Sequence, residues 1–424
     1  MKWRLWYRVR SYTRSSLWVV PFIAIPLEMI AIRVVDRIAP LIGWDFLGLG
    51  MQAARTMLET VVTASLSFLV FAFGSLLVAI QVAGGQLTPR IIATTLLRDN
   101  VVRYTVGLFI FTLLFALGAG NRLETSGHQF VIFVAAVLGI SCFAAFLYLI
   151  DYAARLLRPI TILTRVASDG LGVIRAAYPE PTRRRGVPEQ QRARLGPPRR
   201  TVLHQGTSEI VLAVNVRSLI AQAEACGGTI EFVPQVGDFV AMDEPLFHLY
   251  GAADNVADAG LVDTVAFGPE RTMEQDPTFA FRIVIDIALR ALSPAINDPT
   301  TAVLAIDQLH RLLRLVGQRD LRTDEIADRS GQLRVVVRTP NWDDFVNLAF
   351  SEVRMCGAGN VQVARRLRAM IENLMQTLPV HRRAELERQR SLLERDVGKH
   401  YSYPEDLMLA GVADVQGLGG HSGQ

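Results

Sequence analysis

The chain has 424 residues, half of them hydrophobic, and its formal net charge of +4 is small for that length, which predicts more than one domain and no general affinity for nucleic acid. Lys2 and Lys399 are the only lysines, so the folded middle has no lysine for a Schiff base, a phosphate loop or a biotin or lipoyl group, and we expect no cofactor. Three widely spaced cysteines, Cys142, Cys226 and Cys356, form no C-x-x-C pair, which favours bystander thiols in a reducing compartment over a metal or redox site.

Four apolar stretches in the first 158 residues predict membrane-spanning α-helices. Three of them run for about twenty residues without a charge, which is enough to cross a hydrocarbon core of about 30 Å. The first stretch is weaker because it contains two prolines and a glutamate. The stretches are Leu17–Ile32, Thr60–Ile80, Tyr104–Gly120 and Phe130–Ile150. We therefore expect a basic segment at 1–16 and a four-helix transmembrane module at 17–158.

The arginines of the short connections predict the orientation, because positive residues stay on the cytoplasmic side. They are concentrated in the leading segment, in 87–103 and in 155–165, whereas 121–129 carries only Arg122. Both termini and the polar half of the chain are therefore expected in the cytoplasm. We expect a multi-pass protein of the cell (inner) membrane, with the lipid bilayer as a partner.

Glu28 lies inside the first predicted span, where a carboxylate is costly unless it faces protein or water. One interpretation makes it a functional group on a path through the membrane. The other places it near an interface, paired with Arg33 or Arg55.

The second span carries a polar and small-residue stripe at seven-residue spacing, with Thr63 beside it. Such a stripe is either a packing seam, because small residues let membrane helices approach closely, or a water-facing surface such as a pore lined by one helix per subunit. The residues of the stripe are Thr60, Ser67, Gly74 and Gln81, with Glu59 near its mouth.

Residues 159–200 combine a juxtamembrane helix with an arginine- and proline-rich linker. The linker has several prolines and no apolar period, which is typical of an exposed segment. Its arginines are expected near anionic lipid head groups. Nucleic-acid binding is not expected, because no aromatic stacking platform is interleaved with them.

Residues 201–268 predict a small β unit. Val236–Val240 and Pro245–Phe247 resemble the turn and strand of biotinyl and lipoyl carriers. The carrier lysine is missing, so a covalent cofactor is excluded. A small β module for ligand contact or subunit packing is what we expect here.

A mainly helical cytoplasmic domain is predicted at 269–400, followed by a tail at 401–424. Phe279–Leu292 has helical periodicity and is stopped by Ser293-Pro294. Asp298 and Pro299 are a natural N-cap and first position of a second helix. Polar residues around this turn form our candidate ligand site: Arg271, Glu274, Asp276, Arg290, Ser293, Asn297 and Asp298.

Three interpretations of that cluster remain open. It is a capped structural elbow, or a site for a small anionic ligand held by arginines and a helix start. Alternatively, Glu274, Asp276 and Asp298 hold a hard cation.

The motifs R-T-x-E-Q-D-P at 271–277 and R-A-L-S-P-A-I-N-D-P-x-T-A at 290–302 are long and specific. Together with four preceding membrane helices they resemble a bacterial family of predicted membrane proteins of unknown function. The likeness covers about residues 15 to 400 and includes the V-G-D-F-V segment. It implies an integral membrane protein and supplies no catalytic residue.

Function follows from these features as three hypotheses. The first is a homo-oligomeric channel or transporter whose cytoplasmic domain senses a small ligand or ion. The second is a membrane-anchored sensor or scaffold without transport. The third is a hydrolase built from Asp276, Asp298 and His310, although the chain has no recognisable enzyme motif.

Overall fold

The computed structural model describes the whole chain except residues 1–2, 17, 43–49, 87–98, 123–128, 157, 183–194, 322–323 and 419–424. Residues 183–194 of the predicted arginine- and proline-rich linker and the end of the predicted tail therefore lie outside the described residues. The chain divides into two compact units. We call Tyr12–Gly85 with Pro89–Ile162 the helical unit, and Met1–Ser11, Gln86–Thr88 and Leu163–Gln424 the α/β unit.

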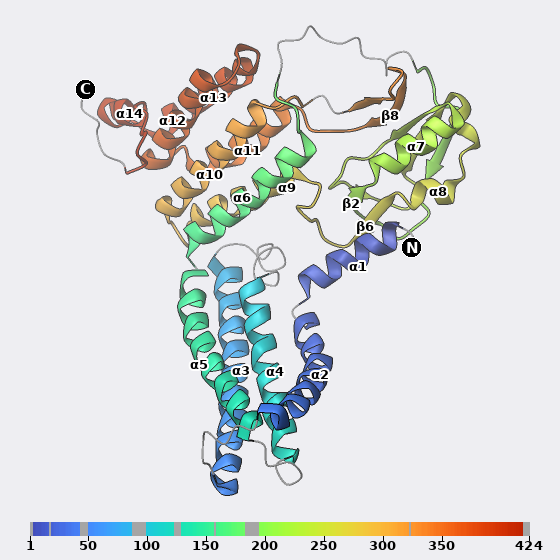
Figure 1. Ribbon diagram of the computed structural model, residues 1–424. Coiled ribbons are helices and arrows are strands. Elements are labelled where there is room, and N and C mark those ends of the chain that lie inside the picture. The colour runs from blue at the N-terminus through green and yellow to red at the C-terminus, as the bar shows by residue number, and fades with distance from the viewer. Residues whose placement is uncertain are drawn as a thin grey trace. The chain divides into compact units, whose positions relative to one another are not determined.

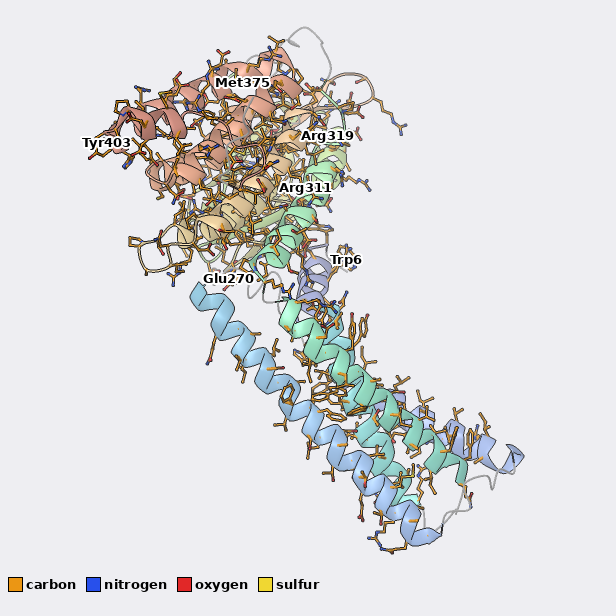
Figure 2. The ribbon with its side chains drawn as sticks, turned by 90° about the vertical axis from the view of Figure 1, so that its left-hand side faces the viewer. Trp6, Glu270, Arg311, Arg319, Met375 and Tyr403 are labelled. Atoms are coloured by element: carbon orange, nitrogen blue, oxygen red, sulfur yellow. The ribbon has the colours of Figure 1, made fainter. Side chains whose placement is uncertain are left out.

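The described part of the helical unit consists of four long helices. They are α2 (Val19–Ile42), α3 (Met51–Gln86), α4 (Asn100–Arg122) and α5 (Gln129–Leu156). Within the described residues, α3, α4 and α5 are long and apolar enough to cross a membrane, which confirms the three stronger predicted spans. Their side chains are mostly carbon (Figure 2). The fourth predicted span is not confirmed, because Glu28, Arg33 and Arg37 interrupt the apolar sequence of α2.

Helix α4 lies at the centre of this unit. Of its most apolar 18 residues 44% are buried inside the protein, against 22% in α3 and in α5. Glycines permit its close packing against α2: a Cβ on Gly107 would come within 2.7 Å of Val20 Cγ1, and one on Gly118 within 2.8 Å of Ile32 Cδ1. Small residues bring membrane helices together in this way.

In its described residues the α/β unit contains two sheets (Figure 1). The five-stranded sheet has the order β1-β5-β3-β8-β7, and only its β3–β8 pair is parallel. The second sheet has the order β4-β2-β6 and is antiparallel. The strands are β1 (Arg200–Leu203), β2 (Glu209–Val214), β3 (Thr229–Phe232), β4 (Phe239–Val240), β5 (Pro245–Tyr250), β6 (Val265–Gly268), β7 (Glu325–Ala327) and β8 (Leu333–Val337).

One apolar core joins these strands to helix α7 (Val216–Cys226). Leu219 of α7, Ile230 of β3 and Phe247 of β5 are fully buried in it, together with Val335 of β8. The shorter elements η3 (Gly251–Asn255) and α8 (Asp258–Val262) complete its edge. Strands β7 and β8 come from the segment that the sequence assigned to the helical domain, so the sheet extends beyond the predicted β unit.

Helices make up the rest of the α/β unit. They are α6 (Pro159–Ala177), α9 (Pro277–Ala291), α10 (Pro299–Gly317), α11 (Trp342–Gly357), α12 (Val361–Thr377), η4 (Val380–Arg382), α13 (Arg383–His400) and α14 (Pro404–Ala410). Helix α6 belongs to this unit from Leu163 onward. Helix α9 is buried along most of its length and packs against α6, where a Cβ on Gly170 would come within 2.6 Å of Ala280 Cβ. Helix α14 lies inside the segment predicted as a tail.

The basic N-terminal segment forms helix α1 (Trp3–Ser15). Its Tyr7 is buried against Ala213 of β2 and Ala266 of β6. Trp6 and Leu5 remain exposed. The first part of α1 therefore packs on the smaller sheet of the α/β unit.

Candidate functional site

The seven predicted ligand residues fall into two groups at opposite ends of α9. Arg271, Glu274 and Asp276 precede the helix, Arg290 lies in its last turn, and Ser293, Asn297 and Asp298 follow it. Fifteen residues at about 1.5 Å per residue make α9 about 22 Å long, so the two groups do not meet in one site. Periodicity predicted the helix, but the prediction of one cluster around a single turn did not take the length of the helix into account.

Asp276 caps the start of α9. Its Oδ1 accepts hydrogen bonds from Thr278 N at 3.0 Å and Phe279 N at 3.2 Å, and from the hydroxyl of Thr278. Its Oδ2 is buried, accepts no hydrogen bond from the described part of the chain, and lies 4.0 Å from Arg271 Nη1. Burial raises the pKa of Asp276, while the hydrogen bonds and Arg271 act in the opposite direction.

The proton of Asp276 makes the stability of the α/β unit depend on pH. The folded protein holds this proton more tightly than the unfolded chain, whose aspartates have a pKa of about 3.9. Between these two pKa values unfolding releases the proton, so the free energy of unfolding falls as pH rises through this window.

Asp276→Asn keeps the capping oxygen but cannot ionise, and it therefore isolates this effect. We expect the wild-type protein to lose stability relative to Asp276→Asn from about pH 4 upward, until Asp276 is ionised, and not beyond. Urea titrations of both proteins in detergent across this range measure the difference. A difference that does not change with pH would contradict the assignment.

The second group forms a turn whose polar groups serve its own backbone. Asp298 caps α10, with Oδ1 3.0 Å from Thr301 N and Oδ2 2.6 Å from its hydroxyl. Ser293 Oγ donates to Arg290 O at 2.7 Å. Asn297 takes a left-handed conformation, with φ of +48°. This arrangement is what the capped-elbow interpretation requires.

The cation and hydrolase interpretations are not supported, because the residues that each requires lie too far apart. Asp298 is separated from Glu274 and Asp276 by the length of α9. His310 Nε2 lies 2.9 Å from Asn373 Oδ1, about 18 Å along α10 from Asp298, so the three proposed hydrolase residues do not meet. Within the described ranges, no group of three or more His, Cys, Asp or Glu side chains is arranged to hold a metal ion.

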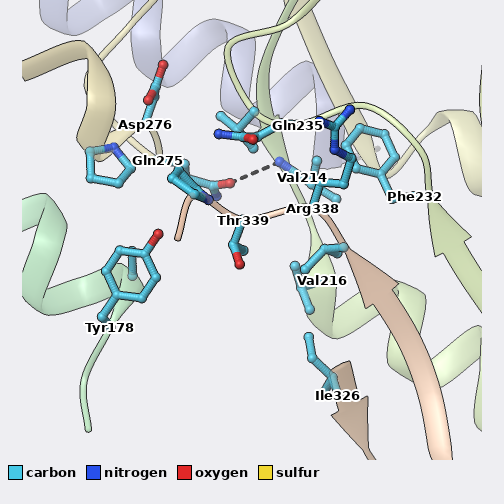
Figure 3. A pocket seen from close by; sticks show the side chains of 15 residues that line it. Tyr178, Val214, Val216, Phe232, Gln235, Gln275, Asp276, Ile326, Arg338 and Thr339 are labelled. Carbon is cyan, nitrogen blue, oxygen red and sulfur yellow. Dashed lines mark hydrogen bonds between the residues drawn. The ribbon is translucent and has the colours of Figure 1, made fainter. Parts of the chain in front are cut away.

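A cavity of about 270 Å³ lies beside Asp276, at the carboxyl ends of β3 and β8 (Figure 3). Five segments line it: the end of α6, the end of β2 with the start of α7, the region after β3, the start of α9, and β7 with the end of β8. Polar lining residues are Tyr178, Gln235, Gln275, Asp276, Arg338 and Thr339. Gln275 accepts a hydrogen bond from Val214 N at 3.0 Å, which fixes its oxygen end. Carboxyl ends of parallel strands are a common location for ligands.

Tyr178 is a deeply buried polar side chain of this cavity, as buried as Asp276. It is 2% exposed, and its ring packs edge-on against Phe345. Burial raises its pKa, and the negative charges of Asp276 and Asp344 add to the effect, so the hydroxyl remains a neutral donor. Sequence reasoning missed Tyr178, which carries no motif, and Arg338, whose signal is the polar R-T-P that directly follows the apolar run at 335–337.

The candidate residues of the apolar helices fall into two groups, one that faces other helices of the unit and one that faces outward. Glu28 faces α4, since a Cβ on Gly118 would come within 2.9 Å of its Oε1, and Arg122 acts on it electrostatically. Among the described residues the charge that acts on Glu28 is that of Arg122, and not that of Arg33 or Arg55, the partners that the sequence suggested. Glu59 forms an ion pair with Arg55 at 3.3 Å and lines a cavity of about 440 Å³ between α3 and α4.

The stripe of α3 points away from the other helices of the unit. Its polar residues Thr60, Ser67 and Gln81 are exposed, and a Cβ on Gly74 would meet nothing within 4 Å. The buried face, with Leu58, Ala72 and Leu76, is on the opposite side of the helix. The stripe is therefore not a seam within one copy of this chain.

Residues 14–373 match the family described as Predicted membrane protein (DUF2254). The chain belongs to this family. As a DUF2254 member it is a predicted membrane protein, in agreement with its three apolar helices, and the resemblance drawn from the two motifs is confirmed.

Relatives of this DUF2254 chain occur in mycobacteria. Uncharacterized proteins of Mycobacterium bovis and of Mycobacterium tuberculosis are each 26% identical to it over 426 residues, covering 96% of this chain and 81% of theirs. No solved structure matches the chain. The family match contains the cavity beside Asp276 and the stripe of α3, while α13 and α14 lie beyond it.

Proposed function

We propose that this DUF2254 protein is a homo-oligomeric channel or transporter of the cell (inner) membrane. Its chain crosses the membrane four times with both termini in the cytoplasm, and its α/β unit senses a small ligand. The observation that carries the proposal is the outward-facing polar stripe of α3.

The hydroxyls of this stripe are satisfied by their own helix. Thr60, Thr63 and Ser67 donate to the carbonyls four residues earlier, at 2.8, 2.9 and 2.8 Å. Such a face tolerates lipid at its hydroxyls, but the Glu59–Arg55 ion pair and the amide of Gln81, at its two ends, are exposed polar groups that hydrocarbon solvates poorly. A second copy of the chain or a water-filled path supplies the partners that lipid lacks.

Helix α2 supports the fourth crossing. Its 24 residues at about 1.5 Å each reach about 36 Å, more than the thickness of a hydrocarbon core. Its glutamate faces α4 and Arg122 rather than the outside of the unit. Charges turned toward protein are the ones that a membrane helix tolerates.

A membrane-anchored sensor without transport is the second candidate. The cavity beside Asp276 favours it, because that cavity lies wholly in the α/β unit and a receptor needs no path through the bilayer.

Native mass spectrometry and ion flux from proteoliposomes separate the two candidates. A channel is expected to show a ring of several copies and flux well above that of empty vesicles. A monomer with background flux, under every voltage and ligand applied, would retire the channel and leave the sensor.

A further inference from the structure

We propose that the cavity beside Asp276 binds a small organic carboxylate with an apolar body. As the ligand of the sensing unit it rests on the proposed function, but as a binding site it stands on the geometry of the α/β unit alone.

The size and the walls of the cavity define the body of the ligand. At about 270 Å³ it falls just below the range of about 300–1,000 Å³ that holds drug-sized ligands, so its occupant is smaller. Most of its walls are apolar side chains. They include Val214, Val216, Phe232, Val236, Ile326, Val337 and Pro340. A single ring or a short aliphatic chain fits such walls.

The polar groups that reach the cavity are mainly donors. The hydroxyl of Tyr178 makes no hydrogen bond within the described part of the chain, although its residue is 98% buried. Arg338 is exposed at the rim and likewise has no ion pair among the described residues. The side-chain oxygen of Gln275 accepts the hydrogen bond from Val214 N, so its amide N–H groups remain to donate into the cavity.

The carboxylate of Asp276 is closed to a ligand. Its Oδ1 already accepts three hydrogen bonds, and its Oδ2 is buried against Gly237 and Arg271 without contact with solvent. Among the residues that the structure describes, no other acidic side chain lines the cavity. A cationic ligand would therefore find no accessible counter-charge, whereas a carboxylate would find a guanidinium, a phenol hydroxyl and an amide.

Competing chemistries are distinguished by matched probes. We propose isothermal titration calorimetry of the full-length protein in detergent micelles, using benzoate, phenylacetate, 3-phenylpropionate and hexanoate, each beside its neutral amide. At least one carboxylate is expected to bind saturably and about tenfold more tightly than its amide. Tyr178→Phe is expected to weaken that carboxylate about fivefold, by removing one hydrogen bond.

Arg338→Gln tests the charge without touching the core, because this side chain is exposed. It is expected to abolish the preference for the carboxylate over the amide. Arg311→Gln is the matched control, since Arg311 is also exposed but lies on α10, outside the cavity lining (Figure 2). Circular dichroism melts of each variant check that it is folded.

The proposal is overturned if no carboxylate of the panel binds, if the amides bind equally well, or if Arg338→Gln and Arg311→Gln behave alike. Flux is not part of this measurement. Binding without flux would retire the channel alone, and flux without binding would retire the ligand site alone.

Discussion

Gly237→Ala is expected to lower the free energy of unfolding of the α/β unit by about 3 kcal/mol. Gly237 has φ of +96°, a conformation that costs an alanine about 1–2 kcal/mol. A Cβ there would also lie 2.5 Å from Oδ2 of Asp276, a carboxylate fixed by three hydrogen bonds. Moving that carboxylate weakens the cap of α9, which adds a second cost of similar size.

Gly331→Ala is the matched control for the backbone term. Gly331 has φ of +83°, and its added Cβ would meet nothing within 4 Å. It is expected to cost only about 1–2 kcal/mol. The difference between the two variants measures the contact with Asp276, and urea titrations in detergent determine both.

The double variant Gly237→Ala with Asp276→Ala separates contact from strain. Removing the carboxylate makes room for the new methyl. The double variant is therefore expected to lose less free energy of unfolding than the sum of the losses in the two single variants. Protection of the first amides of α9 against hydrogen exchange should fall in both single variants. Equal losses for Gly237→Ala and Gly331→Ala would show that the carboxylate is free to move away.

These contacts explain how far sequence reasoning reached in the α/β unit. Local signals were sufficient for α10, whose predicted start at Asp298 and Pro299 is confirmed. The same Asp-Pro pattern at 276–277 starts α9, but Asp276 was grouped with the distant turn instead. Spacing along a helix decides which polar residues meet, and the prediction used proximity in sequence.

The cavity was out of reach for a different reason. Its walls come from segments up to about 160 residues apart, between Ala177 and Pro340, and no local pattern links them. The parallel pairing of β3 with β8 brings Ile230 opposite Val335, more than a hundred residues away. Neither strand alone indicates such a partner, because a short apolar run fits many neighbours.

Apolar length was a sufficient signal in the helical unit, and it predicted α3, α4 and α5 correctly. Sequence periodicity also grouped the stripe of α3 on one face. It left open whether that face is turned inward or outward. Packing of Val61 against Gly139, and of Phe68 against Phe109 and Phe146, turns the stripe outward.

Ser67→Trp is expected to reduce flux from proteoliposomes about tenfold or more if the stripe lines a path. Ser67 is exposed at the middle of the stripe, where an indole from each subunit would fill a narrow pore. If the stripe is instead a seam between copies, the indole forces the helices apart and the oligomer dissociates. Native mass spectrometry of the same sample tells these two results apart.

Leu66→Trp provides the control, because Leu66 is the adjacent residue and about 100° around the helix from Ser67. It is 50% exposed and apolar, as expected for a side chain in lipid. Since both variants add an indole at the same depth, general effects on insertion and folding cancel between them. The channel requires that Ser67→Trp lose flux or assembly while Leu66→Trp keeps both. If the two variants behave alike, the stripe of α3 faces lipid, and the α/β unit must carry the function without a path through the membrane.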